Sequence, residues 1–128
     1  LDMFDKGKMV LNESLTDSMR SAKQFISELS NNLSHPWTIE EMAASSGLGT
    51  TRFTHHCKQL TNLTPMQLLT KKRIDWSKKL LLENPNQSAT QIAYTCGFAT
   101  SQYFSTVFKK QEKCSPQEFR VRNKVEVV

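Results

Sequence analysis

Apolar side chains recur at helical spacing in two separate segments of the chain. Phe53, Cys57 and Leu60 stand at i, i+4 and i+7, and Phe104 and Phe108 repeat the i, i+4 pair. Because this spacing places the side chains on one face of an α-helix, each segment is predicted to be an amphipathic helix with a polar outer face. Two such helices are therefore expected, at about residues 50–60 and 100–111.

Helix starts are marked by capping-box spacing, in which a serine or threonine is followed three residues later by Glu or Gln. The hydroxyl at the cap accepts a hydrogen bond from a helical amide, and the later side chain bonds back to the amide of the cap. Two of the boxes also have proline at the first helical position, where the missing N–H costs little. The boxes are Thr38 with Glu41, Thr64 with Gln67, Ser88 with Gln91, and Ser115 with Glu118.

The two amphipathic segments belong to a unit that occurs twice. Ala43 and Gly47 recur as Ala93 and Gly97 at an offset of 50, whereas the apolar residues of the following helix recur at an offset of 51. The second copy therefore has one extra residue in its turn. A small residue allows two helices to approach closely, and glycine can adopt the positive φ that ends the first helix. The unit is typical of a helix-turn-helix, and two copies indicate a bipartite DNA site.

Several stretches of the chain resemble the AraC/XylS family of transcription regulators. The resemblance covers roughly residues 17–122 and is most specific in the second unit. It implies an all-α fold in which two helix-turn-helix subdomains are joined by a long connector helix. The stretches that carry it are residues 92–98 (IAYTCGF), 103–110 (YFSTVFKK), 115–120 (SPQEFR), 72–74 (KRI) and 79–81 (KLL).

The family fold implies seven helices, whose bounds follow from the breaks in this sequence. They are expected at about 17–33, 39–45, 50–60, 65–83, 89–95, 100–111 and 116–123. The expected domains are a linker tail or cloning remnant at 1–16, a first subdomain at 17–63, a connector helix at 64–84 and a second subdomain at 85–124.

Three positions depart from the family pattern. A glycine usually follows each recognition helix, whereas this chain has Asn62 and Lys113. Asparagine tolerates the left-handed backbone conformation, and lysine tolerates it poorly. Cys57 stands where an aromatic residue is usual, which predicts a less filled first subdomain.

The basic residues are concentrated in one part of the chain. Residues 50–124 hold 13 basic and 4 acidic side chains, a net charge of +9, whereas residues 1–49 hold 4 and 7, a net charge of −3. A field of positive sign raises the local affinity for a polyanion and speeds encounter, without selecting a sequence. Taken alone, such a surplus is equally typical of a solvated surface; beside the repeated motif it favours nucleic acid.

The outer faces of the two recognition helices carry the candidate DNA contacts, and the family resemblance points to the same positions. Arginine and lysine can reach guanine N7 and O6, glutamine can pair with adenine, and a threonine methyl can touch thymine. In the first helix the candidates are Thr50, Thr51, Arg52, Thr54, His55, Lys58 and Gln59. In the second they are Thr100, Ser101, Gln102, Ser105, Thr106, Lys109 and Lys110. The expected phosphate contacts are Thr38, Thr64, Lys72 and Thr90.

Other conspicuous residues have structural interpretations. The run from His55 to Cys57 lacks the i, i+4 ligand pairs of a helical metal site, so no metal is expected. Trp37 and Trp76 each stand beside apolar residues and are interpreted as packing. Arg73 is either a phosphate contact or an internal hydrogen-bond anchor. No cofactor motif or catalytic signature is present, so the chain is not expected to be an enzyme.

The predicted function is sequence-specific binding of double-stranded DNA in transcription regulation. Two unequal half-sites are expected in direct succession about one helical turn apart, with the recognition helices in successive major grooves. The family resemblance implies an activator that contacts RNA polymerase in the bacterial cytoplasm, a sensor or dimerisation domain N-terminal to this module, and no membrane contact. The alternatives are a DNA-binding module of a larger signalling receptor or repair protein, and a basic helical module that binds an acidic protein.

Overall fold

The computed structural model describes residues 2–124, with side chains described from residue 16 onward. All regular structure in this part of the chain is helical, which confirms the all-α prediction. Six of the seven helices begin and end within one residue of the bounds expected from the sequence. The helices are α1 (Asp2–Leu29), α2 (Ile39–Ser45), α3 (Thr50–Thr61), α4 (Pro65–Glu83), α5 (Ala89–Thr95), α6 (Ser101–Glu112) and α7 (Pro116–Arg122).

Helix α1 differs from the expectation at both ends. It begins at Asp2, where a linker was expected up to residue 16, and ends at Leu29 instead of at residue 33. The early end leaves Asn32–Pro36 in an irregular segment that belongs to the second compact unit. The role of residues 1–16 stays a prediction, because Leu1 and the side chains of residues 2–15 lie outside the described part of the structure.

The chain forms two compact units. Among the described residues, the first contains 2–31 and 37–68, and the second contains Asn32–Pro36 and 69–124. Helix α4, confirmed as a continuous helix of 19 residues, starts in the first unit and continues in the second. Most of the expected connector is thus part of the second unit's own core.

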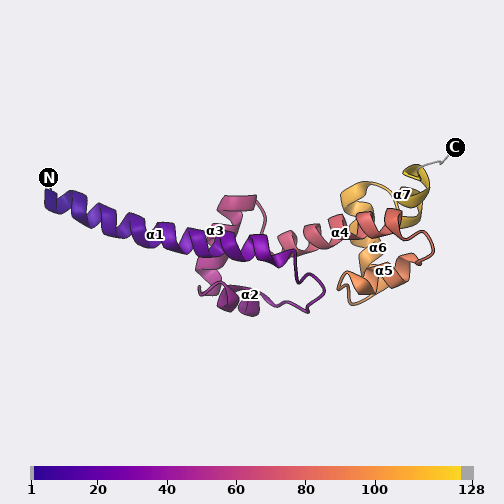
Figure 1. Cartoon of the computed structure of the whole chain (residues 1–128), viewed down its shortest axis with the longest axis horizontal. Helices are drawn as coiled ribbons and strands as arrows, with labels where there is room; N and C mark the ends of the chain where they lie inside the picture. The colour runs from indigo at the N-terminus through magenta and orange to yellow at the C-terminus, as the bar shows by residue number, and fades with distance from the viewer. Residues whose placement is uncertain (1, 125–128) are drawn as a thin grey trace. The chain divides into compact units, whose positions relative to one another are not determined.

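In the first unit, α3 crosses α1 and contacts it, and α2 contacts α3 (Figure 1). Phe25 of α1 holds this unit together, because its ring lies edge-on to Trp37 at 5.4 Å and to Phe53 at 5.5 Å between ring centroids. Cys57, one turn after Phe53 in α3, is also fully buried. The packing interpretation of Trp37 is therefore confirmed.

In the second unit, α5, α6 and α7 gather around the C-terminal part of α4 (Figure 1). Its core is richer in aromatic residues than that of the first unit, with Phe98, Phe104 and Phe108 in succession at 5.0 and 5.6 Å between ring centroids. Phe108 occupies the repeat position that Cys57 holds in the first unit. Trp76 packs against this core, as predicted.

The four predicted capping hydroxyls each accept a hydrogen bond from a helical amide, and two of the four boxes show the reciprocal bond as well. Thr64 and Gln67 exchange two hydrogen bonds of 3.0 and 3.2 Å, and Ser88 and Gln91 form the same reciprocal box. The hydroxyls of Thr38 and Ser115 accept hydrogen bonds of 3.1 Å from the amides three residues later. A further cap lies at Thr100, whose hydroxyl accepts from the Tyr103 amide at 3.0 Å. These caps fix where α2, α4, α5, α6 and α7 start, whereas α3 starts after Gly49 without a side-chain cap.

Both recognition helices end in a residue with left-handed backbone. Asn62 has a φ of 63° and Lys113 a φ of 65°, and each donates its amide to the carbonyl four residues earlier. The departures noted in the sequence therefore occupy the position where glycine is favoured. The strain is greater at Lys113, because a lysine side chain cannot form the local hydrogen bonds that help asparagine.

Lys113→Gly is expected to stabilise the chain by about 1 kcal/mol, because glycine adopts this conformation without the Cβ clash. The substitution also removes a charge, so Lys113→Ala is the matched control: it removes the same charge and keeps the strain. Urea denaturation measures both. Equal stability of the glycine and alanine variants would contradict the proposed strain.

Candidate nucleic-acid interface

The outer face of α3 is exposed because the residues on the opposite side of the helix are buried in the first unit. Phe53 and Cys57 are fully buried, and every predicted contact on this helix is exposed except Thr54, which is half-buried. Leu60 was expected to continue the buried face, but it is 37% exposed because it lies in the last turn, where the core thins out. An open pocket at the start of the helix is lined by Gly49, Thr50 and Arg52 among others.

His56 lies on the inner side of α3 and is not part of this surface. Its side chain is only 3% exposed. Neither ring nitrogen has a hydrogen-bond partner within the described structure. His55, by contrast, is exposed on the outer face, as predicted.

The outer face of α6 is organised in the same way. Phe104 and Phe108 are fully buried, whereas all predicted contacts are exposed apart from the half-buried Ser101. The Thr106 hydroxyl donates to the Gln102 carbonyl at 3.0 Å, so its methyl group is the part left for contact with a base. The two faces are thus alike in geometry and differ in chemistry, with Arg52, His55 and Lys58 on α3, and with Gln102, several hydroxyls and two lysines on α6.

The four expected phosphate contacts lie at helix ends or on α4. Thr38 and Thr90 are exposed, whereas Thr64 and Lys72 are half-buried. The hydroxyls of Thr38 and Thr64 already accept hydrogen bonds from helical amides, so each is oriented and keeps its own O–H for donation. Their contact with phosphate stays a prediction.

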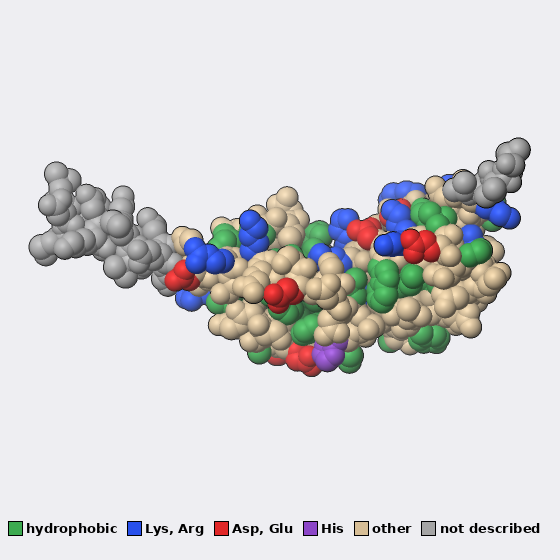
Figure 2. All heavy atoms as spheres, in the orientation of Figure 1, with side chains coloured by type: hydrophobic (Ala, Val, Ile, Leu, Met, Phe, Trp, Pro, Cys, Tyr) green, Lys and Arg blue, Asp and Glu red, His purple; other side chains and the backbone are tan. Residues whose placement is uncertain are grey.

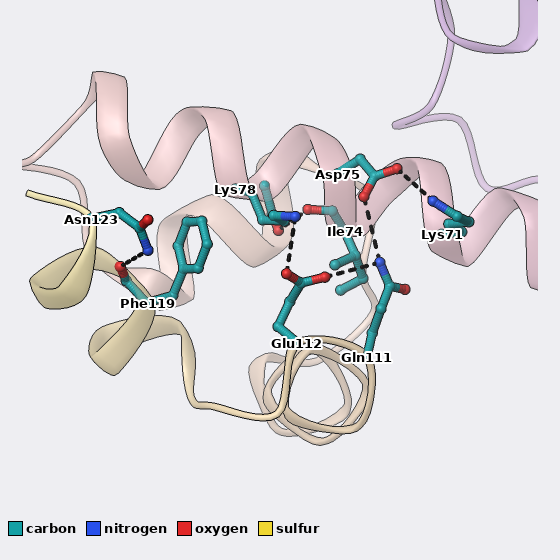
Figure 3. Close-up of polar contacts among 9 residues, drawn as sticks. Lys71, Ile74, Asp75, Lys78, Gln111, Glu112, Phe119 and Asn123 are labelled. Carbon is teal, nitrogen blue, oxygen red and sulfur yellow. Dashed lines mark hydrogen bonds and ion pairs between the residues drawn. The ribbon is translucent and has the colours of Figure 1, made fainter.

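A polar network fixes the C-terminal end of α6 on α4 (Figure 3). Lys78 forms an ion pair of 2.9 Å with Glu112, and both side chains are largely buried, at 32% and 18% exposure. Gln111 donates to Asp75 at 3.5 Å, and Asp75 pairs with Lys71 at 3.1 Å. The periodicity did not reveal this network, which sets the orientation of the second recognition helix within its unit.

Two arginines tie irregular backbone to the second unit. Arg73 donates to the carbonyls of Leu33 and His35 at 2.8 and 2.7 Å, which makes it the internal anchor of the two roles considered from the sequence. Burial lowers the pKa of Arg73, while the nearby Cys96 and Tyr103 act in the opposite direction. Arg120 donates to three carbonyls around the end of α4, a role that the sequence analysis missed.

Lysine and arginine side chains occur on both units in the face drawn in Figure 2, interspersed with acidic side chains. Asp75 and Glu112 form ion pairs with lysines of α4, and Glu118 forms one with Arg122 of α7, so these carboxylates neutralise basic side chains outside the outer faces of α3 and α6. Lys58, Lys109 and Lys110, on the recognition helices themselves, are exposed. These three lysines therefore contribute to the positive charge that can attract a polyanion.

The cysteines are packing residues. All three are buried as free thiols, and burial raises the pKa of Cys96 to about 12, so it is uncharged at neutral pH. Among residues 16–124, no three potential ligands come close enough to hold a metal ion. In the same part of the chain, none of the helices has the length and apolar character that a membrane crossing requires.

The sequence is similar to bacterial regulators of known family. A helix-turn-helix domain profile matches residues 42–122. The chain is 32% identical to the transcriptional activator RhaS of Klebsiella pneumoniae over 113 residues, which are 88% of this chain and 40% of that protein. It is 33% identical to the activator RhaR of Mannheimia succiniciproducens over 100 residues, 78% of this chain and 36% of that protein. The chain thus spans about two fifths of these relatives.

Solved structures agree with the fold. The C-terminal domain of AraT, a response regulator from Geobacillus stearothermophilus, matches with a TM-score of 0.76 at 26% identity, over 83% of this chain and 88% of that one. The DNA-binding domain of the transcriptional factor AdpA, solved with a target DNA, matches with a TM-score of 0.75 at 23% identity, over 79% of this chain and 90% of that one. The second likeness supports the arrangement of helices alone.

Proposed function

Because the chain belongs to the AraC/XylS family of transcription regulators and corresponds to their DNA-binding domain, we propose that it reads a bipartite operator with α3 and α6. Each helix would enter a major groove, and the two half-sites would lie in direct succession about one helical turn apart. A single chain carries the two helices in a fixed order, so the operator need not be palindromic.

One observation carries this proposal: each recognition helix presents a polar outer face opposite a fully buried aromatic anchor. Phe53 in α3 and Phe104 in α6 have no exposed surface, which fixes the rotation of each helix about its own axis. Side chains on the outer faces are then displayed in a set direction, as base reading requires. A basic surface that bound an acidic protein would not need this repeated, oriented display.

The two faces divide the recognition between them. Arg52 and Lys58 on α3 can bind guanine, and His55 adds a further donor or acceptor beside them. On α6, Gln102 can pair with adenine and the Thr106 methyl can contact thymine. We propose that α3 supplies the stronger base discrimination, since a bidentate guanidinium contact discriminates more than hydroxyl or methyl contacts.

Arg52→Ala and His55→Ala are expected to lower the ratio of specific to nonspecific affinity, by about 1 to 3 kcal/mol where a bidentate guanine contact is lost. The ratio is measured by binding to a duplex selected from a random pool and to a scrambled duplex of equal length. Arg20→Ala is the control, because Arg20 is equally cationic and exposed but lies on α1. Wild-type ratios for both variants would show that the outer face of α3 is assigned incorrectly.

The properties of the full-length protein extend beyond this chain. We propose that a sensor or dimerisation domain controls the module, that the regulator activates transcription through RNA polymerase, and that it acts in the bacterial cytoplasm without a cofactor in this domain. Support comes from the RhaS and RhaR relatives, which are transcriptional activators more than twice as long as the aligned region. Copurification of the full-length regulator with RNA polymerase on operator DNA tests the partner.

A further inference from the structure

The repeat assigns one exposed aromatic residue to the DNA-binding face. Because positions in the recognition helices are related by an offset of 51, Tyr103 in α6 occupies the place that Arg52 holds in α3. Likewise, Lys110 occupies the place of Gln59. Arg52 and Gln59, seven residues apart, form one flank of the outer face of α3, so Tyr103 and Lys110 form the same flank of α6.

The structure leaves Tyr103 available for a ligand. Its side chain is 54% exposed although it is large and partly apolar. The ring lies 6.2 Å from that of Phe98, which is 5% exposed and belongs to the core. One side of the phenol is thus supported by packing, which reduces the entropy lost when its outer end is fixed by a contact.

We propose that Tyr103 is a backbone contact of the second recognition helix, in which its hydroxyl donates a hydrogen bond to a phosphate oxygen of the DNA. Lys110, two helical turns further along the same flank, binds the backbone as a charge. A lone neutral hydroxyl cannot make the bidentate guanine contact available to Arg52, so this position supplies affinity on α6 and base discrimination on α3. The proposal rests on the proposed function, because it presumes that α6 meets DNA.

A purely structural role is the competing explanation. Tyr103 packs on Phe98, and its hydroxyl is close enough to Arg73 to affect that guanidinium. Removal of the Tyr103 hydroxyl distinguishes a structural role from a contact with phosphate. A structural hydroxyl affects the free energy of unfolding, whereas a phosphate contact affects DNA affinity while the stability is kept.

Tyr103→Phe tests the assignment in the full chain, since it removes only the hydroxyl. Affinity should fall about fivefold, on a selected duplex and on a random-sequence duplex alike, as expected for the loss of one hydrogen bond. The slope of log affinity against log salt should not change, because a neutral donor releases no counterion. Lys110→Gln should instead reduce that slope by about one unit on both duplexes.

Tyr94→Phe is the matched control, because Tyr94 is 56% exposed in the same unit but lies on α5. It should bind both duplexes as the wild type does. Wild-type affinity of Tyr103→Phe, a loss confined to the selected duplex, or a loss of stability with DNA affinity intact would each overturn the assignment alone. Failure of the wild-type chain to bind either duplex would overturn the proposed function as well.

Discussion

Gly97→Ala is expected to destabilise the second unit by about 3 kcal/mol or more, through overlap and backbone strain together. A Cβ atom at Gly97 would lie 2.9 Å from the Leu33 carbonyl oxygen, 3.0 Å from the Ser34 Cα and 3.1 Å from the Arg73 Cζ. Two of these neighbours are backbone atoms that cannot turn aside. The residue also has a φ of +92°, which disfavours any side chain.

Gly47→Ala is the matched comparison, because Gly47 ends α2 as Gly97 ends α5. Its φ is +75°, but a Cβ atom there would meet nothing within 4 Å, so only the strain of about 1 kcal/mol is expected. The free energy of unfolding of the Gly97 variant is measured by urea denaturation in a Trp37→Phe background. There the fluorescence comes from Trp76 alone, which lies in the second unit. The Gly47 variant is measured in a Trp76→Phe background, where Trp37 of the first unit supplies the fluorescence. Equal losses at the two glycines would contradict the close approach at Gly97.

Arg120→Ala is expected to lower the free energy of unfolding by about 2 to 4 kcal/mol, since it removes the charged donor from three carbonyls, two of them in partly buried hydrogen bonds. The guanidinium donates to Leu81 at 2.9 Å, Asn84 at 3.2 Å and Gln87 at 2.7 Å. These bonds hold α7 against the end of α4 and the segment that leads into α5. The same Trp76 fluorescence measurement applies.

Arg122→Ala provides the control within the same helix. Arg122 is 67% exposed and its ion pair with Glu118 is long, at 3.8 Å, so its loss should change stability by no more than about 0.5 kcal/mol. Arg120→Lys should recover little, because an ammonium group cannot reach all three carbonyls with fixed geometry. Similar losses for the alanine variants at 120 and 122 would contradict the anchoring role of Arg120.

Helices α2 to α7 and the faces of the recognition helices were predictable because they depend on local signals. The Ser88 cap depends on Gln91, three residues later, and the buried face of α6 depends on Phe104 and Phe108, four residues apart. Periodicity also separated the exposed His55 from the buried Cys57. It failed at Leu60, since a pattern of apolar residues does not show where the partner surface ends.

The long-range contacts were not predictable from one sequence. Gly47 and Gly97 look equivalent in the repeat, and they differ only because the segment after α1 packs against Gly97. The role of Arg73 was left open for the same reason, as its acceptors lie 38 and 40 residues earlier in the chain. The exposure of Tyr103 was not predicted, because an aromatic residue next to core positions in the sequence usually indicates packing.

The most direct test of the two-helix account is selection of duplexes from a random pool, followed by binding measurements on the selected duplex at rising salt. Two conserved base clusters centred about 10 base pairs apart are expected, and scrambling either cluster should lower affinity. Affinity should also fall steeply with log salt. A single cluster, or affinity unaffected by scrambling one half-site, would contradict reading by both α3 and α6.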